Sequence, residues 1–209
     1  MSNFSTLYDN YIFYRLFYGC TISDASDAFI IIENLSPHCF DSMFEDCTDL
    51  QKPIKVFSKN LAVSCFEKMY KGCTSLIESP ELSYKYLINR CYAYMFSGCT
   101  SLEEAPELPA TTLAPSCYEG MFSSVYDEDN KLSILSGIVN PPELPATILA
   151  NSCYESMFKG CENLTTAPSL PATSFILNKH ELNESTIDFC YASMFEGCIS
   201  LTNPPELIV

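Results

Sequence analysis

A nine-residue pattern of apolar and polar positions recurs along the chain. In residues 39–47 (CFDSMFEDC) apolar side chains occupy the first, second, fifth, sixth and ninth places, and polar side chains occupy the rest. This spacing is typical of an amphipathic helix of about two turns. Most copies have glycine at the eighth place, such as Gly72 and Gly98, where the end of a helix favours a left-handed residue. The pattern therefore predicts one short helix in each copy.

The copies recur at a regular interval. Five of them begin and end on cysteine, and two degenerate copies have Ile12 or Val125 in place of one cysteine. The ninth places at 47, 73, 99 and 125 are 26 residues apart, whereas the next two intervals are 36 and 37 residues. The longer intervals predict two insertions, near 126–135 and 172–185. The seven copies occupy residues 12–20, 39–47, 65–73, 91–99, 117–125, 153–161 and 190–198.

This period predicts a single domain of stacked repeats over residues 1–209. A unit of about 26 residues cannot bury its own apolar face and must pack on its neighbours. The chain between copies is short and carries prolines such as Pro80 and Pro106, which predicts a brief extended segment. We therefore expect an α/β fold, a leucine-rich-repeat-like right-handed solenoid of seven coils, each with one short parallel strand and one short helix. The repeats are expected near 12–38, 39–64, 65–90, 91–116, 117–152, 153–189 and 190–209.

Aligning the repeats places equivalent residues in columns. One column of aromatic residues follows the first cysteine place, from Phe13 to Tyr191, and a second follows the methionine place, from Phe17 to Phe195. Stacked repeats would put ring over ring and sulfur over sulfur in the core. The expected structural core ladders are Cys39, Cys47, Cys65, Cys73, Cys91, Cys99, Cys153, Cys161, Cys190, Cys198, Met43, Met69, Met95, Met121, Met157 and Met194.

The cysteines leave three interpretations open. Disulfides within a copy are disfavoured, because eight helical steps would separate the two Cα atoms by about 12 Å and a bridge spans at most ~7 Å. A metal site is disfavoured, because the chain has no Cys-x-x-Cys and only His38 and His180, which are expected in solvated loops. The favoured interpretation is reduced, buried thiols that pack as small apolar side chains. We therefore predict no metal site.

The chain is strongly acidic. Its net charge of −15 disfavours nucleic acid and anionic lipid as partners. Glutamates recur in one column of the aligned repeats, and carboxylates stacked at ~5 Å repel one another by about 1 kcal/mol in water. They must therefore face solvent, a cation or a basic partner. The candidate partner-binding acidic column is Glu81, Glu107, Glu143 and Glu206, and the alternative is a solvated acidic face that keeps the stack soluble.

The chain shows no motif of catalysis or nucleotide binding. It has no P-loop, dinucleotide-binding, Gly-x-Ser-x-Gly or His-Glu-x-x-His pattern, and the acidic run at 127–130 lacks the glycine and spacing of a calcium-binding loop. No apolar run reaches the ~18 residues of a membrane-spanning helix, and the first residues show no signal peptide. The sequence therefore predicts a protein that is not an enzyme, with no cofactor and no transmembrane segment.

The segments Phe96–Leu102 (FSGCTSL) and Phe158–Leu164 (FKGCENL) share a Phe-x-Gly-Cys-x-x-Leu motif. This motif resembles the BspA-like class of leucine-rich repeats, over nearly the whole chain. The resemblance implies a surface or secreted protein that adheres to a protein or glycan on another cell or host matrix, although the missing signal peptide leaves a cytoplasmic location open. We expect a non-catalytic macromolecule-binding scaffold, a bacterial adhesion or protein-interaction module. The alternative is a structural spacer segment of a larger repeat protein, and end-to-end self-association is compatible with both.

Overall fold

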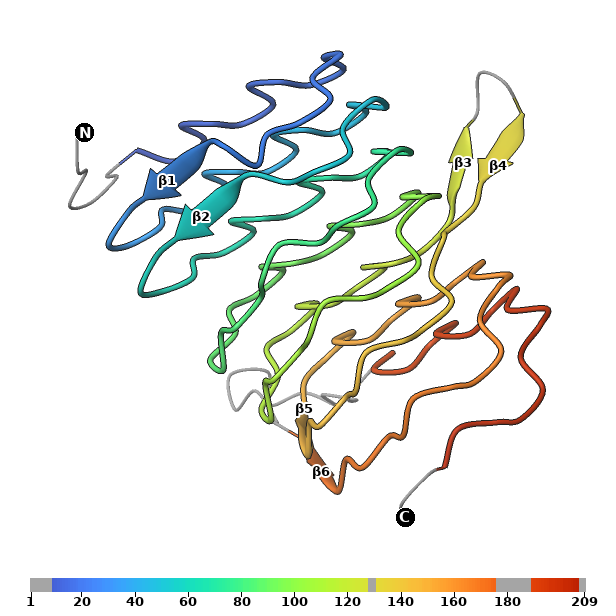
Figure 1. The fold of residues 1–209 in the computed structure, drawn as a ribbon. Coiled ribbons are helices and arrows are strands. Elements are labelled where there is room, and N and C mark those ends of the chain that lie inside the picture. The colour runs from blue at the N-terminus through green and yellow to red at the C-terminus, as the bar shows by residue number, and fades with distance from the viewer. Residues whose placement is uncertain (1–8, 128–130, 176–188, 207–209) are drawn as a thin grey trace.

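The fold is dominated by turns. The structure, a computed structural model, describes residues 9–127, 131–175 and 189–206, and these residues contain no helix. Six short strands pair into three two-stranded sheets (Figure 1). The strands are β1 (Phe29–Ile31), β2 (Lys55–Phe57), β3 (Val125–Asp127), β4 (Leu132–Ile134), β5 (Ile148–Leu149) and β6 (Ser174–Phe175).

The predicted α/β fold is therefore wrong. A leucine-rich-repeat-like right-handed solenoid would place one short helix and one short parallel strand in every coil. In the described part of the chain no copy of the nine-residue pattern is helical, and the only parallel strand pairs are β1 with β2 and β5 with β6. Prolines account for part of the difference, because the segments around Pro80, Pro106 and Pro142 lack backbone donors and form no strand.

Each nine-residue copy folds as a run of consecutive turns instead of a helix. In residues 39–47 the Met43 amide donates to the Phe40 carbonyl at 3.2 Å, three residues back. The next amide, that of Phe44, donates to the Met69 carbonyl of the following repeat at 2.9 Å. The same alternation continues along the run and recurs in the other copies. Every second amide of a run therefore binds the neighbouring repeat, whereas the amides within a helix bond to their own segment.

The backbone of a run repeats every four residues. His38, Ser42 and Asp46 have positive φ angles of 56°, 56° and 61°, a conformation that costs non-glycine residues about 1–2 kcal/mol each. Hydrogen bonds to the next repeat offset this strain. The period of an α-helix is 3.6 residues, or about 100° per residue, so four residues exceed one helical turn by only about 40°. Over only nine residues the two periods select the same apolar places, which is why the pattern predicted a helix.

The two aromatic columns form continuous stacks of rings through the core. Neighbouring ring centroids are 5.2–6.1 Å apart, and the ring planes differ by 4–24°. Phe96, for example, lies between Tyr70 and Phe122 at 5.9 Å from each. Equivalent side chains thus lie one upon another, as the alignment of the repeats predicts. The cysteines and methionines expected in the core ladders are all buried around these rings.

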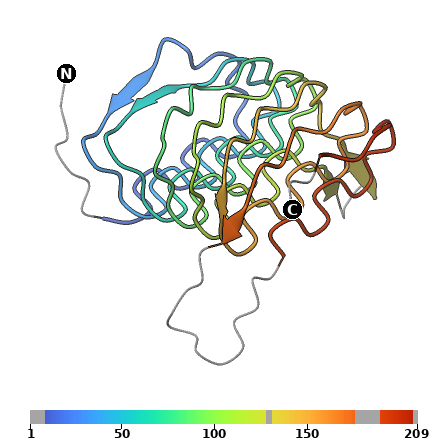
Figure 2. The ribbon, with the colours of Figure 1, turned by 90° about the horizontal axis from the view of Figure 1, so that it is seen from below.

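Successive repeats lie side by side, with the first repeat (blue) and the last (red) at opposite ends of the stack (Figures 1 and 2). Phe29 of β1 pairs with Lys55 of β2, and Ile148 of β5 pairs with Ser174 of β6. The antiparallel hairpin of β3 and β4 spans the first predicted insertion and projects from the stack (Figure 1). The second predicted insertion, 172–185, falls largely outside the described residues.

Candidate functional site

The buried thiols are not suited to chemistry. None of the twelve cysteines, all of which lie in the described part of the chain, forms a disulfide, and only Cys20 is exposed. Burial raises the pKa of the Cys39, Cys91 and Cys161 thiols to about 12. Because the thiolate is the form that attacks electrophiles and binds metals, thiols that stay protonated are weak in both roles. We therefore place no reactive centre in the cysteine ladders.

The second cysteine column forms hydrogen bonds that a purely apolar role for these thiols does not predict. The Cys73 thiol donates to the Phe44 carbonyl of the preceding repeat at 3.1 Å. The same carbonyl accepts the Cys47 amide at 3.1 Å, so the thiol occupies its second lone pair. A signal was available in the sequence, because this place holds cysteine in nearly every copy and an aliphatic residue only at Val125. A purely apolar role would not distinguish cysteine from valine.

Charged side chains on the turn runs bridge successive repeats. Arg90 donates to both oxygens of Glu67, at 2.9 and 3.3 Å, and to Glu119 of the next repeat at 2.7 Å. Tyr94 donates to the second oxygen of Glu119 at 2.7 Å. Burial raises the pKa of the Glu67 carboxyl, but hydrogen bonds from Arg90 and Ser64 outweigh burial and lower it overall. This network joins three consecutive repeats.

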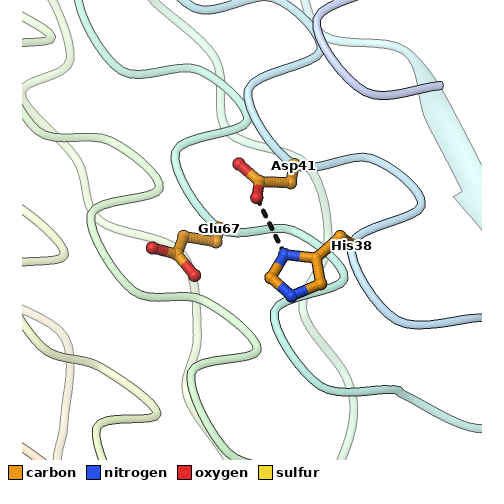
Figure 3. Close-up of side chains that lie close together, drawn as sticks. All are labelled: His38, Asp41 and Glu67. Atoms are coloured by element: carbon orange, nitrogen blue, oxygen red, sulfur yellow. Dashed lines mark hydrogen bonds and ion pairs between the residues drawn. The ribbon is translucent and has the colours of Figure 1, made fainter. Parts of the chain in front are cut away.

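One group that shares Glu67 with this network has the composition of a metal site. One ligand atom each from His38, Asp41 and Glu67 lies within 4.8 Å of the other two, and both carboxylates are buried (Figure 3). His38 is not the solvated loop histidine expected from the sequence. Its ring stacks on Tyr11 with centroids 4.5 Å apart, and its Nδ1 lies 2.9 Å from an oxygen of Asp41.

Existing partners already occupy the carboxylate oxygens of this group. Both oxygens of Glu67 accept from Arg90, and the two oxygens of Asp41 contact His38 and Ser42. A divalent cation would have to displace a guanidinium group that touches the same carboxylate. The geometry therefore assigns His38, Asp41 and Glu67 to ion pairing and hydrogen bonding within the stack.

The acidic column predicted from the sequence lies on the strand side of the repeats. Glu81, Glu107, Glu143 and Glu206 are all exposed. Their neighbours along the chain point the other way. Leu82, Leu108 and Leu144 are buried directly after three of these glutamates. In each of these segments the leucine side chain packs in the core and the glutamate carboxylate faces solvent.

Four grooves follow this column from repeat to repeat. Their volumes are about 470, 420, 450 and 280 Å³. Each groove lies between proline-containing segments of adjacent repeats, where missing backbone donors prevent the segments from pairing. Glu81 lines the first and second grooves, Glu107 the second and third, and Glu143 the third and fourth. These three glutamates and the grooves therefore form one continuous surface, which we call the groove face, whereas Glu206 lines none of the four grooves.

The first groove opens between β2 and residues 78–83. It is closed at one end by the Ile77 amide, which donates to the Gln51 carbonyl at 3.1 Å, and at the other by Ser58 and the Tyr84 hydroxyl, 2.6 Å apart. Between these ends no backbone hydrogen bond joins the two segments in the described chain. Their backbones therefore separate instead of continuing the sheet.

This groove is lined by both apolar and charged side chains. Phe66, Met69 and Met95 of the core columns line it, and Lys55 and Glu81 lie on its two sides. Because Phe66, Met69 and Met95 are buried beneath the groove, a ligand would contact mainly β2 and residues 78–84 and could pair with either sign of charge.

No known protein family matches the chain, and neither the curated proteins nor the solved structures show significant similarity to it. The resemblance to BspA-like repeats therefore stays a prediction. The part of the chain that the structure describes has no helix long and apolar enough to span a membrane. His180 and most of the acidic run at 127–130 lie outside the described residues.

Proposed function

We propose that this protein is a non-catalytic protein-binding scaffold that contacts a basic partner through the groove face. One observation carries the proposal: four consecutive grooves share a row of exposed glutamates held between buried leucines and proline rings. Stacked repeats commonly bind through such extended surfaces. The net charge of −15 adds a long-range attraction for basic partners.

The spacing of the repeats suits an extended segment of the partner. Ring centroids of neighbouring repeats are 5.8 Å apart from Phe66 to Tyr92 and 6.1 Å from Tyr92 to Tyr118. Alternate residues of an extended chain are separated by about 6–7 Å. Because neighbouring backbones separate further at the grooves, successive glutamates lie at least this far apart, and lysine or arginine spaced two or more positions apart in a bound segment would meet them.

An apolar patch continues this surface toward the first repeat. Phe29, Ile31 and Phe57 are exposed on β1 and β2, where Ile31 and Phe57 lie opposite each other in the sheet. Exposed large apolar side chains next to a charged rim are typical of interaction surfaces. The preferred partner segment therefore combines apolar residues at one end with basic residues at the other.

The resemblance to BspA-like repeats supports a location in which this binding would take place. It favours a surface or secreted adhesion module whose partner is a protein on another cell or in host matrix. A structural spacer would need no charged groove face, and the row of grooves therefore favours binding.

Charge reversal on the groove face tests the proposal. The triple variant Glu81→Lys, Glu107→Lys and Glu143→Lys is compared with the control Asp49→Lys, Glu103→Lys and Glu162→Lys, which changes the net charge equally and lines none of the grooves. Fluorescence anisotropy measures binding to a labelled peptide with lysine at alternate positions, and surface capture measures binding to basic matrix proteins.

We expect the groove-face variant to bind at least about tenfold more weakly than the wild-type chain, because several ion pairs of up to about 1 kcal/mol each become repulsive. The control variant should lose much less affinity, and wild-type binding should weaken with salt. Equal losses in the two variants, or binding that salt does not change, would contradict the proposal.

A further inference from the structure

In the last described run of the stack, alternate backbone amides donate to no described carbonyl. Inside the stack, alternate amides of each turn run donate to the next repeat, as from Ser156 to the Ala192 carbonyl at 2.8 Å and from Phe158 to the Met194 carbonyl at 3.0 Å. Among residues 189–206, the last that the structure describes, no further run lies beyond this one. Among the described residues, no backbone acceptor meets the amides of Tyr191, Ser193, Phe195 and Gly197.

The first repeat presents the matching row of acceptors. Internal runs receive hydrogen bonds on the carbonyls of alternate residues. In the first run no described group donates to the equivalent carbonyls, those of Ile12, Tyr14, Leu16 and Tyr18. Donors and acceptors thus have the same number and the same two-residue spacing. Exposed, unpaired rows of this kind are templates for pairing with another chain.

Both end runs already have the backbone conformation of internal runs. Positive φ angles occur at Tyr11 (64°) and Arg15 (51°) in the first run, and at Phe189 (68°) and Ser193 (52°) in the last. A second copy could therefore continue the stack without rearranging either run. The approach is also sterically open at Gly19, where an added Cβ would meet no atom within 4 Å.

Aromatic side chains match across the two end faces, column for column. Phe13 and Phe17 end the two ring stacks on one face, and Tyr191 and Phe195 end them on the other. A third pair lies one residue before the first cysteine column.

In that third pair, Tyr11 is 51% exposed and Phe189 is 62% exposed. Phe189 is also a large apolar residue at positive φ, where a side chain of this kind is strained. Inside the stack the same column already stacks, with Tyr11 on His38 at 4.5 Å. A head-to-tail junction would place Phe189 on Tyr11 in the same way and cover both rings.

We propose that this chain assembles head to tail, with the last repeat of one copy packed on the first repeat of the next as if the stack continued. The contact is heterologous, so it leaves one free face of each kind and builds linear oligomers. The assembly does not depend on the groove face. Because each copy carries a net charge of −15, added salt should strengthen it, which is the opposite of its effect on a basic partner.

Two end-face variants test the proposal by complementation. Tyr11→Asp disables the first face and Phe189→Asp disables the last, and aspartate tolerates positive φ better than most residues. Tyr86→Asp is the control, because Tyr86 is 89% exposed and lies on neither end face. Sedimentation velocity measures the mass of each protein over a range of concentrations, and circular dichroism shows that each remains folded.

We expect the wild-type chain and the control to grow in mass with concentration, and each end-face variant alone to stay monomeric. An equimolar mixture of the two variants should form dimers and nothing larger, because the mixture retains one intact junction. A wild-type chain that stays monomeric, a variant that still grows, or a mixture without dimers would each overturn the proposal.

Discussion

Replacement of Phe96 by alanine tests whether the ring stacks hold the repeats together. Phe96 is 1% exposed, and stacked rings cover both of its faces. Phe195 ends the same column, is only partly buried, and has a described ring on one face alone, that of Phe158 at 5.7 Å. Phe57 is 55% exposed and lies in neither column. The three phenylalanines therefore form a graded series.

The structure sets the size of each effect. Truncating a fully buried phenylalanine to alanine lowers the free energy of unfolding by about 3–5 kcal/mol, a range that includes ring contacts worth about 0.5–1.5 kcal/mol each. Phe195→Ala removes one ring contact and less buried surface, so we expect about 1.5–2.5 kcal/mol. Phe57→Ala removes a largely exposed side chain and should change the free energy by less than about 0.5 kcal/mol.

Urea denaturation followed by circular dichroism measures all three variants. The expected order of destabilisation is Phe96→Ala, then Phe195→Ala, then Phe57→Ala. The reasoning fails if Phe96→Ala is no more destabilising than Phe57→Ala, because the ring columns would then not form the core.

Two further predictions concern charge and thiols. Arg90→Gln should lower the free energy of unfolding at pH 7 by about 1–3 kcal/mol, because Glu67 loses its charged donor. The fold lowers the pKa of Glu67, so the contribution of this carboxylate to stability is present above its ordinary pKa of 4.5 and is lost as pH falls through the folded value. The acid denaturation curves of the wild-type chain and the Arg90→Gln variant should therefore converge at low pH. A thiol reagent at pH 8 should modify Cys20 alone in the folded protein and the other cysteines only in urea, as mass spectrometry would show.

The sequence predicted correctly which residues lie on one another in successive repeats, but it predicted the wrong backbone conformation within each repeat. The 26-residue interval and the purity of the columns predicted that Phe40 and Phe66, far apart in the chain, would stack, and their rings are 5.5 Å apart. The helix prediction failed because nine residues do not distinguish a period of four from one of 3.6. The residue types at the positive-φ positions did not indicate this backbone conformation. Tyr94 and Lys68 are not residue types that usually signal positive φ as glycine does.

Charged groups on the two sides of the repeats differed in how far they could be predicted. Exposure of the acidic column follows from simple repulsion between stacked carboxylates, and Glu107 is exposed as this argument requires. The network of Arg90, Glu67 and Glu119 depends on side chains that meet across repeats in different columns. The grooves could not be inferred from composition either, because their depth depends on how far neighbouring backbones separate where proline prevents pairing.

The most direct test of this structure is to identify the carbonyl that each amide in a turn run binds. Scalar couplings across hydrogen bonds, measured by NMR on the deuterated protein, report donor and acceptor as a pair. The structure predicts that the Phe96 amide couples to the carbonyl of Met121, which it contacts at 2.9 Å in the next repeat. Coupling to the carbonyl of Tyr92, four residues back as in a helix, would contradict it.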